Sequence, residues 1–313
     1  MQVCCYERKV IHRRNDAFTE YGVFVEQYGY KALVQAPPFK SIDSTEWDEF
    51  DGAEYDLSEP VLDSKTFAIA FCITDITSAS GLFELLSDKA YHTFDFRELG
   101  KTYRLRLTSN GSLSSKVRLG NLSLSFADDF PTSDEAEPYP VGAADVRQSG
   151  YELDDIDFSR FGVYILNGTD DNVLKAPDVR PNLTINTKGE AGVSYDDEIV
   201  MYKPKDVVVK MLIRAANVTV FWERWNALFT ALIKPDIRRL YIDKIVEEFD
   251  CFYRKCSVTK FDILRNGRVW CEFSVTLTFT NSRPTGNYAL LVTEDDELVL
   301  TEDGESYILL RND

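Results

Sequence analysis

The chain has 313 residues, of which 44% are hydrophobic and 28% are charged, so it can bury more than one apolar core. Its 52 acidic and 35 basic side chains give a formal charge of −17, which argues against nucleic-acid binding through a basic patch. The 20 Phe, 16 Tyr and 4 Trp residues, with many Val, Ile and Thr, favour a mainly β fold. No apolar run approaches the length of about 18 residues that a membrane-spanning helix needs, so membrane insertion is not expected.

Residues 1–17 are predicted to form an N-terminal arm. The segment lacks the apolar stretch of a secretion signal. We expect it either to dock on an acidic neighbour or to be frayed. Its basic side chains are Arg8, Lys9, Arg13 and Arg14.

The six cysteines do not have the spacing of a zinc site, and only two histidines exist in the chain. Cys72 and Cys271 lie inside apolar runs, where a reduced cysteine acts as a small hydrophobic residue. We therefore expect a chain that is made and kept in a reducing cytoplasm. The other four are Cys4, Cys5, Cys251 and Cys256.

Two long segments, residues 18–131 and 151–286, resemble each other and are predicted to be tandem copies of one module. Without a gap, 18–73 matches 158–213 at ten identical positions, where ordinary residue usage would give roughly three. The strand-like alternation of 65–73 recurs in 205–213. The identical pairs are Phe18/Phe158, Gly22/Gly162, Val23/Val163, Ala36/Ala176, Pro37/Pro177, Gly52/Gly192, Tyr55/Tyr195, Asp56/Asp196, Lys65/Lys205 and Ile73/Ile213.

The likeness continues into a helix and a final hairpin. After a six-residue insertion, GLFELLSDKAYHTFDF lies against ALFTALIKPDIRRLYI, and Thr219 and Pro235 are the expected N-cap and end of the second helix. At an offset of 153, NLSLSFADDFP lies against SVTLTFTNSRP. Asn-Gly pairs at Gly111 and Gly267 predict the turn of an antiparallel hairpin in each copy.

Two segments lie outside the copies. Residues 132–150 are rich in Pro, Gly and acids and are predicted to be a linker. Residues 287–313 contain LLVTEDDE followed by LVLTEDGE, which predicts a short β-meander with acidic turns rather than a calcium site.

No pattern in the chain indicates catalysis. No serine lies in a GxSxG context, and no phosphate-cradling GxxxxGK[ST] or GxGxxG occurs. His92 is expected at the surface or at an element boundary. We therefore predict no catalytic, cofactor-binding or metal-binding residue and no cofactor.

The loop 43–63 holds nine acids and no base, so nothing favours a carboxyl with the raised pKa that general-acid catalysis needs. Two interpretations of its aromatic residues stay open. Trp47 and Tyr55 could stack on a sugar ring, or they could anchor the loop on the protein. The recurrence of Tyr55 as Tyr195 favours anchoring.

The order of these patterns is similar to one known family. An aromatic-Gly-Val step, a Pro-containing loop, Gly near Tyr-Asp, the helix WERWNALFTALIKPD, a strand led by Tyr or Phe and a final VTLTF strand occur in sequence. This resembles the N-terminal ring-forming domain of distal tail proteins in long-tailed bacteriophages, best over 158–284 and less well over 18–131.

The resemblance implies a β-sandwich or split barrel with one flanking helix in each copy. It also implies a non-catalytic ring in the virion, at the tail tip or baseplate, that joins the tail tube to the hub or host-attachment apparatus. Such a protein of a phage or prophage would contact itself and the tail-tube, tape-measure and hub or fibre proteins. With two copies in one chain, the ring would be a trimer with pseudo-sixfold symmetry, or alternatively a hexamer. An acidic channel would let DNA pass, and the loop 43–63 is one candidate for its lining.

Two other function classes stay open. A tandem β-sandwich that binds carbohydrate or a receptor would expose clustered aromatic residues at loop tips, although the repeated helix argues against it. An enzyme would need a constellation of reactive residues that the sequence does not contain.

Overall fold

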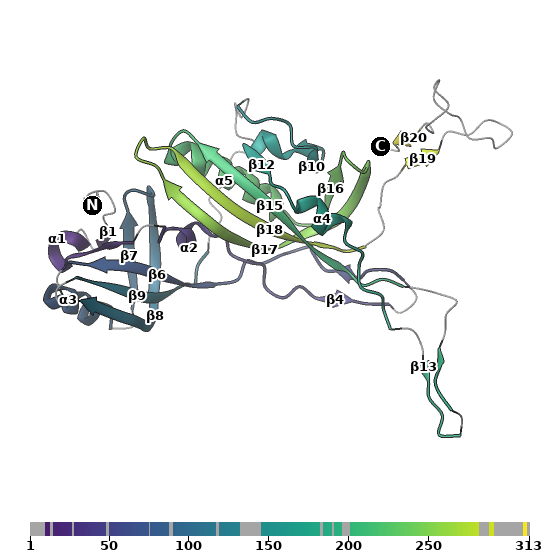
Figure 1. Ribbon diagram of the computed structural model, residues 1–313, viewed down its shortest axis with the longest axis horizontal. Helices are drawn as coiled ribbons and strands as arrows, with labels where there is room; N and C mark the ends of the chain where they lie inside the picture. The colour runs from purple at the N-terminus through teal and green to yellow at the C-terminus, as the bar shows by residue number, and fades with distance from the viewer. Residues whose placement is uncertain are drawn as a thin grey trace.

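The computed structural model describes residues 10–12, 15–26, 28–47, 50–74, 76–87, 90–116, 119–131, 145–181, 184–189, 191–195, 201–281, 288–290 and 309–311. These residues form antiparallel β-sheets with few helices, which confirms the expected mainly β class (Figure 1).

The first half of the chain forms one seven-stranded sheet in the order β2-β1-β7-β8-β9-β6-β3. Part of the expected N-terminal arm belongs to it, because β1 pairs with β7 through Val10 and Phe96. The basic residues of that arm lie outside the described residues. The strands are β1 (Val10–His12), β2 (Asn15–Asp16), β3 (Val23–Val25), β6 (Lys65–Ile73), β7 (Tyr91–Phe96), β8 (Lys101–Lys116) and β9 (Leu119–Asp128).

The second half forms another seven-stranded sheet, β11-β10-β16-β17-β18-β15-β12, which has the same strand order as the first. In each half the seven strands are joined edge to edge in one sheet, and the second sheet is strongly curved in Figure 1. Its strands are β10 (Tyr151–Leu153), β11 (Ile156–Asp157), β12 (Val163–Ile165), β15 (Lys205–Ala215), β16 (Arg238–Ile242), β17 (Glu247–Ile263) and β18 (Val269–Phe279).

Each of the two aromatic-Gly-Val steps lies where a helical turn leads into a strand. Helix α1 (Ala17–Tyr21) and the 3-10 helix η1 (Phe158–Phe161) precede β3 and β12. Gly22 and Gly162 end these turns at φ 63° and 72°, a left-handed conformation that glycine adopts without strain. The repeated glycine therefore marks a change of direction between helix and strand.

Each sheet carries one longer helix, α3 (Ile76–Leu86) or α5 (Val218–Leu232). Helix α5 buries Phe221, Trp225, Leu228 and Leu232, which recur every three or four residues. Its N-cap is Asn217, whose side chain accepts a hydrogen bond from the Val220 amide, and not Thr219. Asn217 is the better cap because its short side chain reaches back to the free amides of the first turn.

Two expectations about the last hairpins need correction. The turn at Gly267 is confirmed, with φ +78°. Asn110 and Gly111, however, lie within β8 beside a bulge, and β9 starts only at Leu119. The equivalent residues Lys65 and Lys205 pair with Asp128 of β9 and Phe279 of β18, so Asp128 and Phe279 are equivalent as well. The offset between β9 and β18 is therefore two residues shorter than the sequence suggested. A shift of two keeps every side chain on its face, so the alternation alone could not reveal it.

The interior of each half is apolar, and His92 on β7 lies in it with an exposed fraction of 1%, contrary to the expected surface position. Its ring centre is 6.4 Å from that of Phe94, so the period of the strand points it inward. Near the C-terminus, β19 (Tyr288–Leu290) pairs with β20 (Leu309–Arg311). The acidic turns of the expected meander and most of the expected linker, 132–144, lie outside the described residues.

Candidate functional site at the contact between the two halves

Each half has one long loop, which leads into β6 in the first half and into β15 in the second half. The first loop (residues 36–64) contains β4 (Ser44–Thr45) and β5 (Glu54–Tyr55). The second loop (residues 176–204) contains β13 (Thr184–Ile185) and β14 (Ser194–Tyr195). Both have the same internal pairing: Ser44 pairs with Tyr55 and Thr184 with Tyr195. The loops therefore have the same backbone plan.

The base of the first loop is bound to the second sheet. The Phe39 amide donates to the Arg254 carbonyl at 3.1 Å, and the Tyr253 hydroxyl donates to the Pro37 carbonyl at 2.8 Å. The Phe39 and Tyr253 rings meet edge to face, with centres 5.4 Å apart. Burial raises the pKa of Tyr253 far above its ordinary value, so this phenol remains a hydrogen-bond donor.

The far end of the first loop lies against the end of β18. The Ala53 amide donates to the Thr280 carbonyl at 2.9 Å, and the Tyr55 and Phe252 rings lie 4.8 Å apart. A Cβ at Gly52, which has φ +75°, would lie 1.9 Å from the Thr280 carbonyl oxygen. Glycine is needed here both for the backbone conformation and for the close approach of two main chains.

A buried cation joins the tip of the first loop to the base of the second. Arg180 is 6% exposed, donates to the Gly52 carbonyl and lies 3.2 Å from a Glu46 carboxylate oxygen. The Asp51 carboxylate accepts from the Tyr202 amide at 2.8 Å. Acids of the loop 43–63 therefore have partners in the second half of the same chain, and they fix its position by charge-assisted hydrogen bonds.

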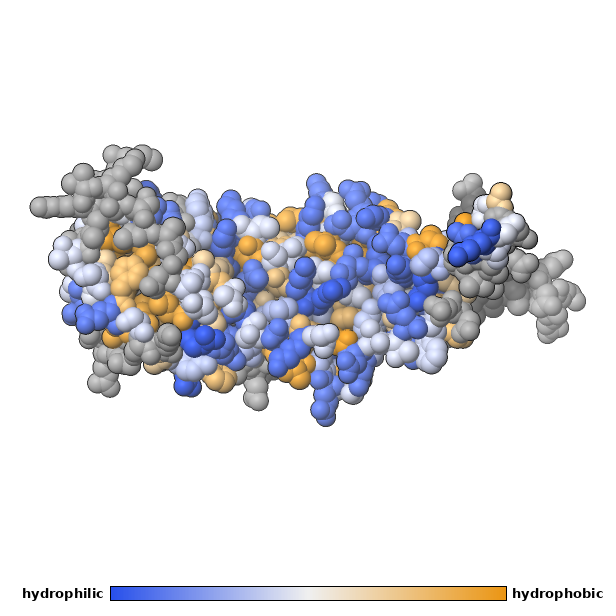
Figure 2. Space-filling view, turned by 90° about the horizontal axis from the view of Figure 1, so that it is seen from below, coloured by the Kyte–Doolittle hydropathy of each residue, from blue (hydrophilic) through white to orange (hydrophobic). Residues whose placement is uncertain are grey.

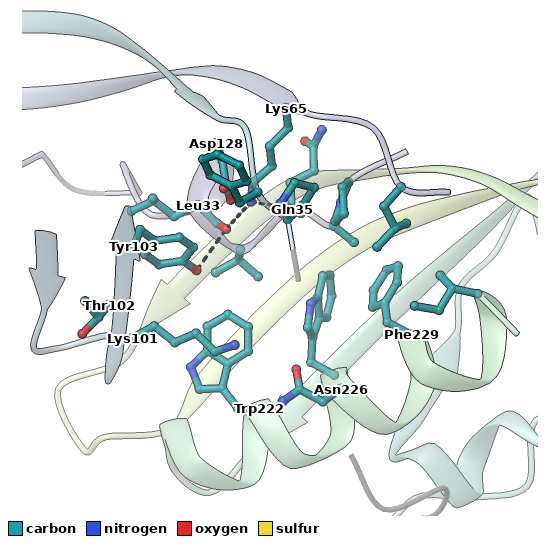
Figure 3. Close-up of a pocket in the computed structure, with 18 of the residues that line it drawn as sticks. Leu33, Gln35, Lys65, Lys101, Thr102, Tyr103, Asp128, Trp222, Asn226 and Phe229 are labelled. Carbon is teal, nitrogen blue, oxygen red and sulfur yellow. Dashed lines mark hydrogen bonds between the residues drawn. The ribbon is translucent and has the colours of Figure 1, made fainter. Parts of the chain in front are cut away.

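A cavity of about 500 Å³ separates the start of β8 from α5 (Figure 3). On the α5 side, the Trp222 indole donates to the Leu99 carbonyl at 2.8 Å, and Lys101 Nζ lies 4.4 Å from the centre of the Trp222 ring. On the opposite wall, Lys65 Nζ donates to the carbonyls of Leu33 and Gln35 at 2.9 Å each.

Loss of water around the ammonium group lowers the pKa of Lys65 to about 8, although the Asp128 carboxylate opposes the shift. This lysine is held as a hydrogen-bond donor rather than as a base beside a nucleophile, because its ammonium group donates to main-chain carbonyls at the end of α2 (Lys31–Val34). The position recurs, since Lys205 donates to the carbonyls of Val173 and Lys175 at the end of α4 (Thr169–Leu174). We interpret both lysines as clamps that hold a loop base.

Metal ligands, membrane spans and thiols can be assessed for the described residues. Within the described ranges, no group of three or more His, Cys, Asp or Glu side chains is placed to hold a metal ion. Over the same part of the chain, no helix is long and apolar enough to span a bilayer. The described thiols of Cys251, Cys256 and Cys271 are buried, and burial raises the pKa of each.

The structure separates the two interpretations of the aromatic residues in the loop 43–63. Tyr55 packs on Phe252 and anchors the loop, while Trp47 is 49% exposed. Sequence reasoning missed Arg180 and Tyr253, which hold the first loop in place. One signal was present, because Arg180 is matched by another cation, Lys40, at the equivalent position of the first loop.

The described residues define a mainly β protein whose two sheets are held together by a loop and a helix. No family model matches the sequence, and no curated protein matches it either. Among solved structures, the crystal structure of SPP1 Dit (gp 19.1), described as a paradigm of the hub adsorption apparatus in phages that infect Gram-positive bacteria, matches it with a TM-score of 0.29. That match has 10% sequence identity and covers 87% of this chain and 98% of that one.

Proposed function

We propose that this chain is a non-catalytic structural protein of a phage tail tip, and that it forms a ring between the tail tube and the hub or host-attachment apparatus. One observation carries the proposal. Two sheets of the same strand order each extend a loop of the same plan, and the first loop is bound by the second half. A unit that binds a copy of itself side by side is suited to assembly in rings.

Tandem duplication of one module is part of this proposal. In support, the paired positions at the loop bases and tips recur at the sequence offset of 140, as in the bridges Phe39–Leu62 and Val179–Tyr202. The modules would be residues 18–131 and 151–286, joined by the linker 132–150. Six modules from three chains would then close a ring with pseudo-sixfold symmetry, and six chains with the first modules outside the ring are the alternative.

The partners follow from this location in the virion. The ring would contact tail-tube, tape-measure and hub or fibre proteins, and its acidic chain would let DNA pass through a central channel without binding it. The first loop contributes acids to the contact between the halves rather than to an isolated solvated loop.

Electron microscopy of the purified protein tests the proposal. We expect rings with a central hole and, after addition of tail tubes from the same phage, rings at one end of the tubes. Particles without a hole at every protein concentration would contradict a ring-forming function. Binding to a glycan array by those particles would favour the carbohydrate-binding alternative instead.

A further inference from the structure

The two loops have the same plan but different surroundings. The first loop lies along the second sheet, whereas β13 of the second loop projects away from both sheets (Figure 1). A Cβ at Gly52 would collide with Thr280, but a Cβ at Gly192, which has φ +97°, would meet nothing within 4 Å. The second loop thus shares the internal pairing of the first loop, but Gly192 has no protein surface against it.

Apolar residues at the base of the second loop are exposed where their counterparts are covered. Val34 is 2% exposed and lines the cavity against α5, while Leu174, at the equivalent position, is 58% exposed. Ala36 is buried and Ala176 is exposed. Val179, the counterpart of Phe39, is 48% exposed. Exposed apolar side chains gathered at one site indicate a contact surface.

The complementary surface is present on the first half. Strands β8 and β17 start at equivalent positions, because Lys101 pairs with the last residue of β7 and Glu247 with the last residue of β16. Counted from these starts, Leu107 is equivalent to Tyr253 and Thr108 to Arg254. Thr108 is exposed, and Leu107 is only partly buried. Figure 2 shows apolar residues gathered at the end of the molecule that holds α1 and α3, away from the second sheet.

We infer that the second loop of one chain binds the first half of a second copy of this chain, in the way that the first loop binds the second half within one chain. This inference rests on the proposed ring-forming function and names its interface. Val179 takes the position of Phe39 and pairs with Thr108 of the neighbouring copy. Lys40 of that copy takes the position of Arg180 and donates to the Gly192 carbonyl.

The contact is head to tail, because different surfaces of the two copies meet. Such an interface closes into a ring when the rotation from copy to copy allows it. Each chain then has one loop bound internally and one bound by its neighbour, and every module in the ring has the same surroundings.

Mixing two variants, each with one introduced cysteine, tests the inference. In a background of Cys4→Ser and Cys5→Ser, protein with Val179→Cys is mixed with protein with Thr108→Cys under mild oxidation. We expect a disulfide between chains, because the equivalent internal residues, Phe39 and Arg254, are joined main chain to main chain at 3.1 Å. The internal pair Phe39→Cys with Arg254→Cys is the positive control for this geometry.

A second variant measures the interface without cross-linking. Leu174→Asp places a charge on a side chain that is exposed in the single chain, so the fold should be unaffected, and we expect self-association to weaken about tenfold or more. Leu264→Asp, on another residue that is 43% exposed, is the matched control and should leave association unchanged.

The outcomes separate the two proposals. Two results together would overturn the assigned interface while leaving the ring intact. Rings would form normally with Leu174→Asp, and Val179→Cys would cross-link to Thr108→Cys no more often than Leu264→Cys does. Absence of any assembly by the wild-type chain would contradict the proposed function and this inference together.

Discussion

Removal of one oxygen atom at the contact between the halves should loosen the first loop. The Tyr253 hydroxyl donates to the Pro37 carbonyl at 2.8 Å, and the Tyr253 residue has an exposed fraction of 0%. In Tyr253→Phe the ring still packs on Phe39, but the carbonyl loses its donor. Loss of this partly buried hydrogen bond costs about 1–2 kcal/mol. If that cost falls on the bound state of the loop, opening becomes more frequent by a factor of about 5–30.

Hydrogen exchange measures that opening. The Phe39 and Ala53 amides donate across the contact to Arg254 and Thr280, so their exchange should accelerate by the same factor in Tyr253→Phe. Tyr91→Phe is the matched control, because it removes an equally short hydrogen bond, to Asp129, within the first half alone. The reasoning is refuted if exchange at 38–56 is unchanged in Tyr253→Phe, or if Tyr91→Phe accelerates it equally.

Three further predictions concern titration, thiols and glycines. The pKa of Lys65 is about 8 in the folded state against an ordinary 10.5, so between these pH values the unfolded state binds a proton that the folded state lacks. The free energy of unfolding should therefore rise with pH over this range. The rise should be larger in wild type than in Lys65→Met, by up to about 3 kcal/mol. A thiol reagent at pH 8 should leave three cysteines unmodified until denaturant is added: Cys251, Cys256 and Cys271. At protein concentrations too low for association, Gly192→Ala should lower the free energy of unfolding by about 1 kcal/mol, because alanine is strained in this backbone conformation. Gly52→Ala should lower it by about 2 kcal/mol more, because the added Cβ also collides with Thr280.

The contradicting results are distinct. Equal pH slopes for wild type and Lys65→Met, from urea unfolding at pH 7.5 to 10.5, would show that the ammonium group is not desolvated. Modification of the three thiols in the native protein would contradict their burial. Equal destabilisation by the two glycine substitutions would contradict the close approach of the first loop to Thr280.

The sequence was informative where the physical signal is local. Periodicity predicted the strands at 65–73 and 205–213 and the buried face of α5, and the Asn-Gly pair predicted the turn at Gly267. The same Asn-Gly signal gave a wrong prediction at Asn110, because the Asn-Gly pair lies beside a β-bulge and β8 continues past it. Local turn preference is outweighed there by continued pairing with β9.

The candidate site was largely beyond sequence reasoning. The contact of Phe39 with Tyr253 joins residues more than two hundred positions apart, and no local pattern encodes such a contact. His92 looked like a surface residue by type, but its strand position points it into the core. Only the recurrence of Gly52 as Gly192, and of a cation at Lys40 and Arg180, could have indicated that the two loops are related.

The number of chains in the assembly tests the central claim most directly. Native mass spectrometry of the purified 35.8 kDa chain should give a closed oligomer, a trimer if both modules of each chain stand in the ring. A hexamer would replace pseudo-sixfold symmetry by true sixfold symmetry. A monomer that persists at the highest concentrations would contradict the view that these two halves are built to bind further copies of themselves.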